Sequence, residues 1–154
     1  NCPPVTLLSR RLLPDMLRRE NKSALINLAS FMAEMPFPCS STYNTTKTYD
    51  DVFSRSIALE HPGKLLVNPD KIDVLSVRPL YVTTPMTFQY KGIIAVNANQ
   101  CARGSLNKLG VDSYTHGHWF HRLQAQLANA LPIWLIHTAV RRKTDQHLER
   151  NKKA

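Results

Sequence analysis

The sequence predicts an α/β fold in which parallel strands are joined by crossover helices. Two short, mostly apolar runs, residues 24–29 and 72–77, have the length of strands that are buried on both faces. Amphipathic helical patterns precede, separate and follow them, and this alternating order favours parallel strands. The chain has 154 residues, which is enough for one domain with a hydrophobic core.

The helices before and after the first strand are predicted from their apolar periodicity. Residues 5–20 place leucines on one face and arginines on the other, and Pro3 and Pro4 suit the first helical turn. A second helix is predicted over residues 42–61. Its side chains that are expected to face inward are Tyr49, Val52, Phe53 and Ile57.

The rest of the chain is predicted to contain a loop, a short strand and more helices. Residues 63–70 are expected to form a surface loop, and a third strand is placed at residues 116–120. Asn97 is expected to cap a helix that Gly110 stops. The helices expected here cover residues 97–109, 119–130 and 133–148.

The chain is strongly basic, with a formal net charge of +9. Residues 141–154 contain six basic and two acidic side chains, and a second basic cluster lies in the first helix. Solvated helix faces are the ordinary interpretation, and contact with an anionic membrane surface or a nucleotide phosphate is the alternative. The motifs of nucleic-acid-binding proteins are missing from the sequence, so no nucleic-acid partner is expected. No apolar run reaches the roughly 18–20 residues that span a bilayer.

Cysteines and histidines give weaker signals. The cysteines are widely spaced, which predicts free thiols in a reducing compartment: Cys2, Cys39 and Cys101. Cys39 is expected to serve in packing. Three histidines lie close together in sequence: His116, His118 and His121. Asp112 is the only other residue near them in sequence that could bind a metal, so no metal is expected.

Three side chains suggest proton-transfer chemistry. Ser30 follows the first predicted strand, and Tyr43 and Lys47 lie four residues apart at the start of the next helix, on one helix face. Ligands of open α/β sheets bind beyond the carboxyl ends of strands. The pKa of an isolated tyrosine phenol is about 10, and a neighbouring ammonium lowers it because it favours the phenolate. With a serine hydroxyl to bind the substrate oxygen, this group could interconvert a carbonyl and an alcohol.

Residues 24–47 resemble the active-site segment of short-chain dehydrogenases/reductases. The similarity is greatest to the branch with very-long-chain 3-oxoacyl-CoA reductases and 17-beta-hydroxysteroid dehydrogenases. That branch has an Asn-x-Ser-Ser strand end, a Pro-x-Pro loop, a Tyr-x-x-x-Lys pair and then Phe-Ser. Matching features in this chain are Asn27-x-x-Ser30, Pro36-x-Pro38, Phe53-Ser54, Leu13-Pro14-x-Met16, Pro79-Leu80-Tyr81-Val82-Thr83-Thr84, Thr115-His116-Gly117-x-x-x-His121 and Leu131-Pro132-x-Trp134.

The resemblance implies a role for each matching residue. Ser30 would orient the substrate carbonyl, Tyr43 would be the general acid/base, and Lys47 would favour the phenolate and bind the nicotinamide ribose. Asn1 falls on the position of the family's fourth catalytic residue, an asparagine. The residues expected to contact the cofactor are Tyr43, Lys47, Pro79, Val82 and Thr84.

The resemblance also implies an architecture. Residues 1–154 would form one partial catalytic domain, the C-terminal part of a Rossmann-type doubly wound parallel sheet. Its active-site segment would be residues 24–47, and residues 93–154 would supply a substrate lid and basic helices. The family's glycine-rich turn and Asn-Asn-Ala-Gly strand end do not occur in the sequence. Either the N-terminal nucleotide-binding strands are missing from this sequence, or the product is inactive.

The function implied is an NADP(H)-dependent oxidoreductase, with NAD(H) as the alternative cofactor. Its substrate would be lipid-like, a long-chain 3-oxoacyl thioester or a steroid. The resemblance places the protein at the cytosolic face of the endoplasmic reticulum membrane, otherwise in the cytoplasm, and implies a homodimer. Its basic C-terminal helix is expected to contact the membrane surface. The alternative is an inactive fragment that serves as a membrane-surface or protein-binding module.

Overall fold

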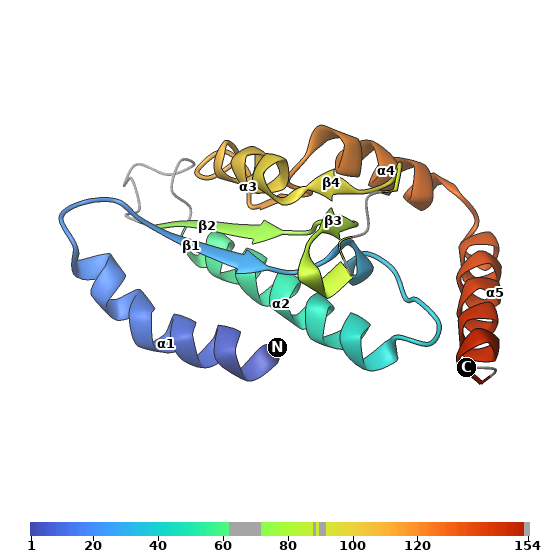
Figure 1. Cartoon of the computed structure of the whole chain (residues 1–154). Coiled ribbons are helices and arrows are strands. Elements are labelled where there is room, and N and C mark those ends of the chain that lie inside the picture. Colours follow the sequence, from blue (N-terminus) through green and yellow to red (C-terminus); the bar gives the residue numbers. More distant parts are fainter. Residues whose placement is uncertain (62–71, 88, 90–91, 153–154) are drawn as a thin grey trace.

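The computed structural model describes residues 1–61, 72–87, 89 and 92–152 (Figure 1). The main helices and strands, in chain order, are α1 (Cys2–Arg18), β1 (Ser23–Leu28), α2 (Ser41–Glu60), β2 (Ile72–Val77), β3 (Val82–Thr83), β4 (Val96–Asn97), α3 (Ala98–Leu106), β5 (Tyr114–Thr115), α4 (Trp119–Ala130) and α5 (Ile133–Lys152). Two short 3-10 helices, η1 (Phe31–Ala33) and η2 (Pro85–Thr87), follow β1 and β3.

The sheet confirms the predicted α/β class. Strands β1, β2 and β5 form a three-stranded parallel sheet in that order, and β1 pairs with β2 from Ser23–Ile72 to Leu28–Val77. Helices α1 and α2 lie on one side of it, and α3 and α4 lie on the other (Figure 1). Strands β3 and β4 form a separate two-stranded parallel sheet. The carboxyl ends of β1 and β2, after which Ser30 and Pro79 follow, therefore lie at the same edge of the sheet.

Most predicted elements lie within a few residues of the observed ones. Strand β2 has the predicted bounds, and Asn97 caps α3 by accepting a hydrogen bond from the Asn99 amide at 2.9 Å. Helix α1 begins earlier than predicted, with proline in its first turn. Helix α5 continues past the predicted end to Lys152. The loop predicted at residues 63–70 lies outside the described residues.

The third strand was placed wrongly. It comprises Tyr114–Thr115 rather than residues 116–120. Gly117 has a φ of +75°, which breaks the extended backbone. His118 then caps α4, because its Nδ1 accepts a hydrogen bond from the Phe120 amide at 3.2 Å. The aromatic run after Gly117 therefore starts a helix.

The prediction of which side of α2 faces inward was also partly wrong. Tyr49 and Val52 are exposed, whereas Ile57 is buried in a small core with Met16, Ile72 and Val74. Most of the buried side of α2 is polar: Asn44, Asp50, Asp51 and Ser54. Asp51 and Ser54 face polar partners on the strands, as in the hydrogen bond from Asn27 Nδ2 to Ser54 Oγ at 2.8 Å. Polar matching across the interface replaces the expected apolar contact.

Cys39 is exposed and has a φ of +63°, so its predicted packing role is wrong. All three cysteines are free, as predicted. Cys101 is buried, and burial raises the pKa of its thiol. Within the described ranges, every helix is too short or too polar to cross a bilayer.

A buried arginine joins the end of β2 to α2. Arg78 follows β2 directly, and its guanidinium binds both carboxylate oxygens of Asp51, at 2.6 and 2.8 Å. Ser76 Oγ also donates to Asp51 at 2.7 Å. The Arg78 and Asp51 side chains are only 9% and 4% exposed, so this two-point ion pair is shielded from water.

We expect Arg78→Met to lower the free energy of unfolding by about 3–5 kcal/mol, because it leaves the Asp51 carboxylate buried without its main cation. The matched control is Arg55→Met, since Arg55 also binds Asp51 but is 41% exposed. Its loss should cost about 1 kcal/mol or less. Urea denaturation measures both, and equal effects would contradict the proposed importance of Arg78.

Candidate active site

The loop after β1 is joined to the loop after β2. Ser30 lies two residues beyond β1, and the amide of Phe31 donates to the Pro79 carbonyl oxygen at 3.1 Å. Ser30 is half-buried and caps η1, because its Oγ accepts a hydrogen bond from the Met32 amide at 3.2 Å. The predicted catalytic serine and the predicted cofactor-contacting Pro79 thus belong to adjoining loops.

Lys47 lies at the carboxyl end of β1. Its Nζ donates to the Leu28 carbonyl oxygen at 2.6 Å and to Asp50 Oδ2 at 3.1 Å. The Lys47 side chain is only 12% exposed, and the Asp50 side chain is 1% exposed. Asp50 Oδ1 is buried and has no hydrogen-bond partner among the described residues. The ammonium is therefore held beside the strand end and away from bulk water.

Tyr43 precedes Lys47 by one turn of α2 and is half-buried. Asn1 approaches the same turn, because its Nδ2 donates to Thr46 Oγ1 at 2.9 Å. Thr46 Oγ1 in turn donates to the Tyr43 carbonyl oxygen at 2.9 Å. No hydrogen bond between described residues joins the side chains of Ser30, Tyr43 and Lys47 directly. Their catalytic roles, and that of Asn1, remain predictions.

Val82 and Thr84 belong to the segment after β2. Val82 pairs with Val96 of β4 and accepts a hydrogen bond from Thr87 Oγ1 at its carbonyl oxygen, at 2.6 Å. The Thr84 amide donates to Thr87 Oγ1 at 3.1 Å. These contacts give the segment a defined turn, and they leave the predicted cofactor contacts of Val82 and Thr84 as predictions.

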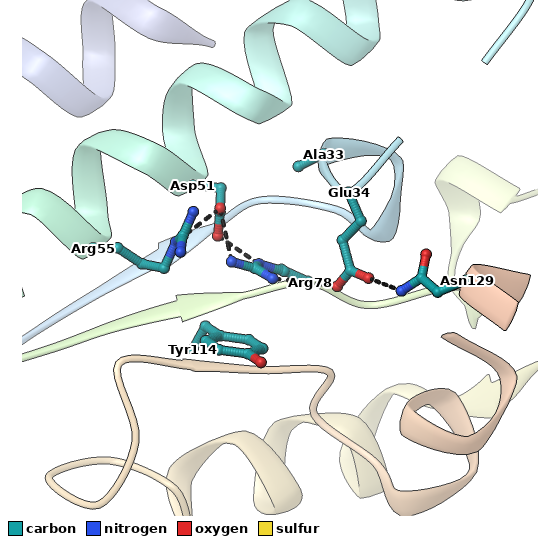
Figure 2. Close-up of a pocket in the computed structure, with 7 residues that line it drawn as sticks. All are labelled: Ala33, Glu34, Asp51, Arg55, Arg78, Tyr114 and Asn129. Carbon is teal, nitrogen blue, oxygen red and sulfur yellow. Dashed lines mark hydrogen bonds and ion pairs between the residues drawn. The ribbon is translucent and has the colours of Figure 1, made fainter. Parts of the chain in front are cut away.

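A polar pocket of about 380 Å³ lies around Arg78. Figure 2 shows the side chains that line it. Its lining residues are Ala33, Glu34, Asp51, Arg55, Arg78, Tyr114 and Asn129. The Arg78 guanidinium carbon lies 4.0 Å from the centre of the Tyr114 ring, and its Nη1 lies 3.3 Å from Glu34 Oε1. The charged groups pair with one another, and Ser30, Tyr43 and Lys47 do not line this pocket. We therefore assign it a structural role.

Glu34 joins three parts of the chain through its carboxylate. It accepts hydrogen bonds from His116 Nε2 at 2.7 Å and from Asn129 Nδ2 at 2.8 Å, in addition to its contact with Arg78. Burial raises the pKa of Glu34. The hydrogen bonds from His116 and Asn129 and the charges of His116 and Arg78 outweigh burial and lower this pKa to about 2.

The clustered histidines have structural contacts of different kinds. His116 binds Glu34, His118 caps α4, and His121 is buried with Nε2 3.0 Å from the Tyr81 carbonyl oxygen. Burial lowers the pKa of His121, against the opposing effect of the carbonyl groups of Tyr81 and His116. In the part of the chain that the structure describes, no group of three or more His, Cys, Asp or Glu side chains is arranged to hold a metal ion.

Sequence reasoning missed Asp50, Arg78 and Glu34. An arginine at the end of an otherwise apolar strand, just before Pro79, was an available signal of a buried ion pair. Asp50 lies three residues after Lys47, a spacing that brings the two side chains together on a helix. Glu34 had no such signal, because its partners are 44 to 95 residues away in sequence.

Comparison with known proteins gives a consistent family match. Residues 1–92 match the family model described as short chain dehydrogenase. Human inactive hydroxysteroid dehydrogenase-like protein 1 is 29% identical over 140 residues, covering 88% of this chain and 40% of the relative. Human very-long-chain 3-oxoacyl-CoA reductase is 27% identical over 136 residues, covering 88% of this chain and 41% of the relative. The chain therefore spans less than half of either relative's length.

The fold is also found among solved structures. The structure from a study of 7beta-hydroxysteroid dehydrogenase stereoselectivity superimposes with a TM-score of 0.64 at 17% identity, covering 81% of this chain and 48% of that one. At this identity the likeness establishes the fold alone. It agrees with the parallel sheet and flanking helices described above.

Glu34→Gln should destabilise the protein at neutral pH and have little effect near pH 2. The folded state lowers the carboxyl pKa from 4.5 to about 2, so ionised Glu34 stabilises the fold above pH 4.5. That stabilisation is lost as the pH falls from 4.5 towards 2. Unfolding free energies of the parent and variant across this range test it. The exposed Glu20→Gln is the control, and a pH-independent effect of Glu34→Gln would contradict the prediction.

Lys47→Met should cost about 3 kcal/mol of stability, because Asp50 would be left buried and unpaired. The double variant Lys47→Met/Asp50→Leu removes both charges and should recover most of that loss. Lys22→Met is the control, since the Lys22–Asp73 pair has a lysine that is 48% exposed. If Lys47→Met is as stable as the parent by urea denaturation, the pair does not stabilise the fold.

Proposed function

The chain belongs to the short chain dehydrogenase family, and from that membership we propose that the protein is an oxidoreductase that interconverts a keto and a hydroxyl group. We further propose that its substrate is a long-chain 3-oxoacyl thioester or a steroid, and that NADP(H) is its cofactor. The observation that best supports this proposal is the position of the shielded Lys47 ammonium, which lies at the carboxyl end of β1 and one helical turn after Tyr43.

The donor set at this strand end suits the nicotinamide half of a dinucleotide. Two hydrogen bonds of the Lys47 ammonium go to Leu28 and Asp50, and an ammonium has three N–H donors. Counting contacts between described residues, one donor is therefore left for a ribose hydroxyl. The glycine-rich turn that holds the pyrophosphate in this family does not occur in the sequence, so the proposal needs that part of the cofactor site to come from outside residues 1–154.

A nicotinamide cofactor, when bound, would supply or accept the hydride of the proposed reaction. The Ser30 hydroxyl donates a hydrogen bond to the substrate oxygen, which it can do while its oxygen still accepts from the Met32 amide. The Tyr43 phenol gives its proton to that oxygen during reduction and takes it back during oxidation. Lys47 stabilises the phenolate that remains after reduction.

The alternative function is a non-catalytic module that binds a membrane surface or a protein. One relative carries the word inactive in its name. In this chain Ser30 Oγ caps η1 and the Lys47 ammonium is paired with Asp50, so both have structural roles that would persist without catalysis. An upstream reading frame that encodes the glycine-rich turn would support the enzyme, and a stop codon there would support the module.

Tyr43→Phe should reduce turnover by about 10²- to 10⁴-fold, because it removes the proton donor and acceptor while keeping the ring. The longest natural form of the protein, with NADPH and a 3-oxoacyl-CoA or a ketosteroid, is the form to assay. Tyr49→Phe is the matched control, since it lies on the same helix and its hydroxyl contacts Thr6 Oγ1. Near-parent NADPH oxidation by Tyr43→Phe would remove Tyr43 from the mechanism.

A further inference from the structure

Asp50 carries a buried carboxylate on α2. Its side chain is 1% exposed, and its Oδ2 lies 3.1 Å from Lys47 Nζ. Its other oxygen, Oδ1, is buried and has no hydrogen-bond partner among the described residues. A buried carboxylate is strongly unfavourable unless a cation pairs with it. Of the ion pairs between described residues, the one with Lys47 is the one that meets this need, so the carboxylate holds the ammonium beside it.

The backbone of Asp50 is fixed relative to β1 by two consecutive hydrogen bonds. Asn27 Nδ2 donates to Ser54 Oγ at 2.8 Å, and Ser54 Oγ donates to the Asp50 carbonyl oxygen at 2.5 Å. Asn27 and Ser54 are both buried, so water competes little for these contacts. Lys47 Nζ donates to the carbonyl oxygen of Leu28, the last residue of β1, at 2.6 Å. The carboxylate and the ammonium are therefore both tied to the same strand.

The position of the Lys47 ammonium is thus defined before any ligand binds. A lysine side chain is flexible, and ordering it on ligand binding costs free energy. In this structure two partners fix the ammonium, and the Lys47 side chain is only 12% exposed. Its third N–H makes no hydrogen bond with a described residue. A ligand that accepts from this N–H meets an ordered donor, and such preorganisation raises affinity.

Stability alone is a weak explanation for the pair of Lys47 and Asp50. A buried ion pair is often no more stabilising than apolar side chains of similar size in the same place. Helix α2 is also joined to β1 by the contact between Asn27 and Ser54. Apolar side chains could not supply an ammonium at a defined point beside the strand end, which is what this pair provides.

We propose that Asp50 is a positioning residue of the candidate active site, which holds the Lys47 ammonium where a ribose hydroxyl of the nicotinamide cofactor binds. The inference rests on the proposed oxidoreductase function, because that function gives the ammonium its ligand. Asp50 acts through Lys47 and takes no part in the transfer of the hydride or the proton. Without its carboxylate, the ammonium moves towards solvent and the cofactor loses one ordered hydrogen-bond donor.

Reductive methylation followed by peptide mass spectrometry tests the positioning without any need for activity. Lys47 should react about tenfold faster in Asp50→Leu than in the parent, because the loss of a charge-assisted contact lets the ammonium leave its shielded place. The control is Asp73→Leu, which removes a carboxylate that pairs with Lys22 near the amino end of β2. It should leave the Lys47 rate unchanged. An unchanged Lys47 rate in Asp50→Leu would overturn the proposal.

Kinetics of the longest natural form of the protein test the consequence for the cofactor. Asp50→Leu should raise the KM for NADPH by about tenfold, the effect of losing one hydrogen bond from a charged donor. Asp50→Asn keeps an oxygen that accepts from the ammonium and should raise this KM less. Asp73→Leu should leave it unchanged. A merely structural role for Asp50 would lower kcat through the folded fraction and leave the KM for NADPH at the parent value, which would refute the proposal.

A double-mutant cycle shows whether Asp50 acts through Lys47. Lys47→Met and Lys47→Met/Asp50→Leu should have the same KM for NADPH, because no ammonium is left for the carboxylate to position. A further rise of KM in the double variant would contradict the proposal. A parent protein that methylates as expected but has no NADPH-dependent turnover with a 3-oxoacyl-CoA or a ketosteroid would refute the proposed function instead, while the hold of Asp50 on Lys47 would stand.

Discussion

The guanidinium of Arg78 is the contact on which the arrangement of the other elements depends. It extends from the end of β2 and engages Asp51 on α2, Glu34 after η1 and the Tyr114 ring on β5. Glu34 extends the network to α4 through Asn129. The hydrophobic core is small, so this buried polar network holds together elements that apolar packing holds together in larger domains. The loop that leads to Tyr43 is anchored at Glu34 by the same network.

The sequence contained enough information for the fold class and for the strand that carries the least ambiguous pattern. Strand β2 was predicted with its observed bounds because apolar residues dominate it and Pro79 follows it. The inward side of α2 was predicted from apolar residues alone and was therefore partly wrong, since Asp51 and Ser54 are buried by virtue of partners on other elements. Such partners become visible only once the strands are placed beside the helix.

The candidate site was likewise predictable from the sequence only in part. The spacing of Tyr43 and Lys47 is local and could be recognised in the sequence, and so could the position of Ser30 after a strand. The contact between Lys47 and the Leu28 carbonyl oxygen could not be recognised, because Leu28 is 19 residues away in sequence. The contact with Asp50 had a local signal in its three-residue spacing. In the structure Lys47 therefore neutralises the buried carboxylate of Asp50, and it also lies at the carboxyl end of β1.

Strand β1 has consequences for how the chain behaves in solution. Among the described strands it pairs with β2 alone, so no described strand pairs with the backbone along its other edge. Ile26 and Leu28 on one face of it are 42% and 63% exposed. An open strand edge beside an exposed apolar face is a template on which further strands add, whether from the same polypeptide or from a neighbour. We therefore expect a preparation of residues 1–154 alone to self-associate as its concentration rises, unless another strand covers this edge.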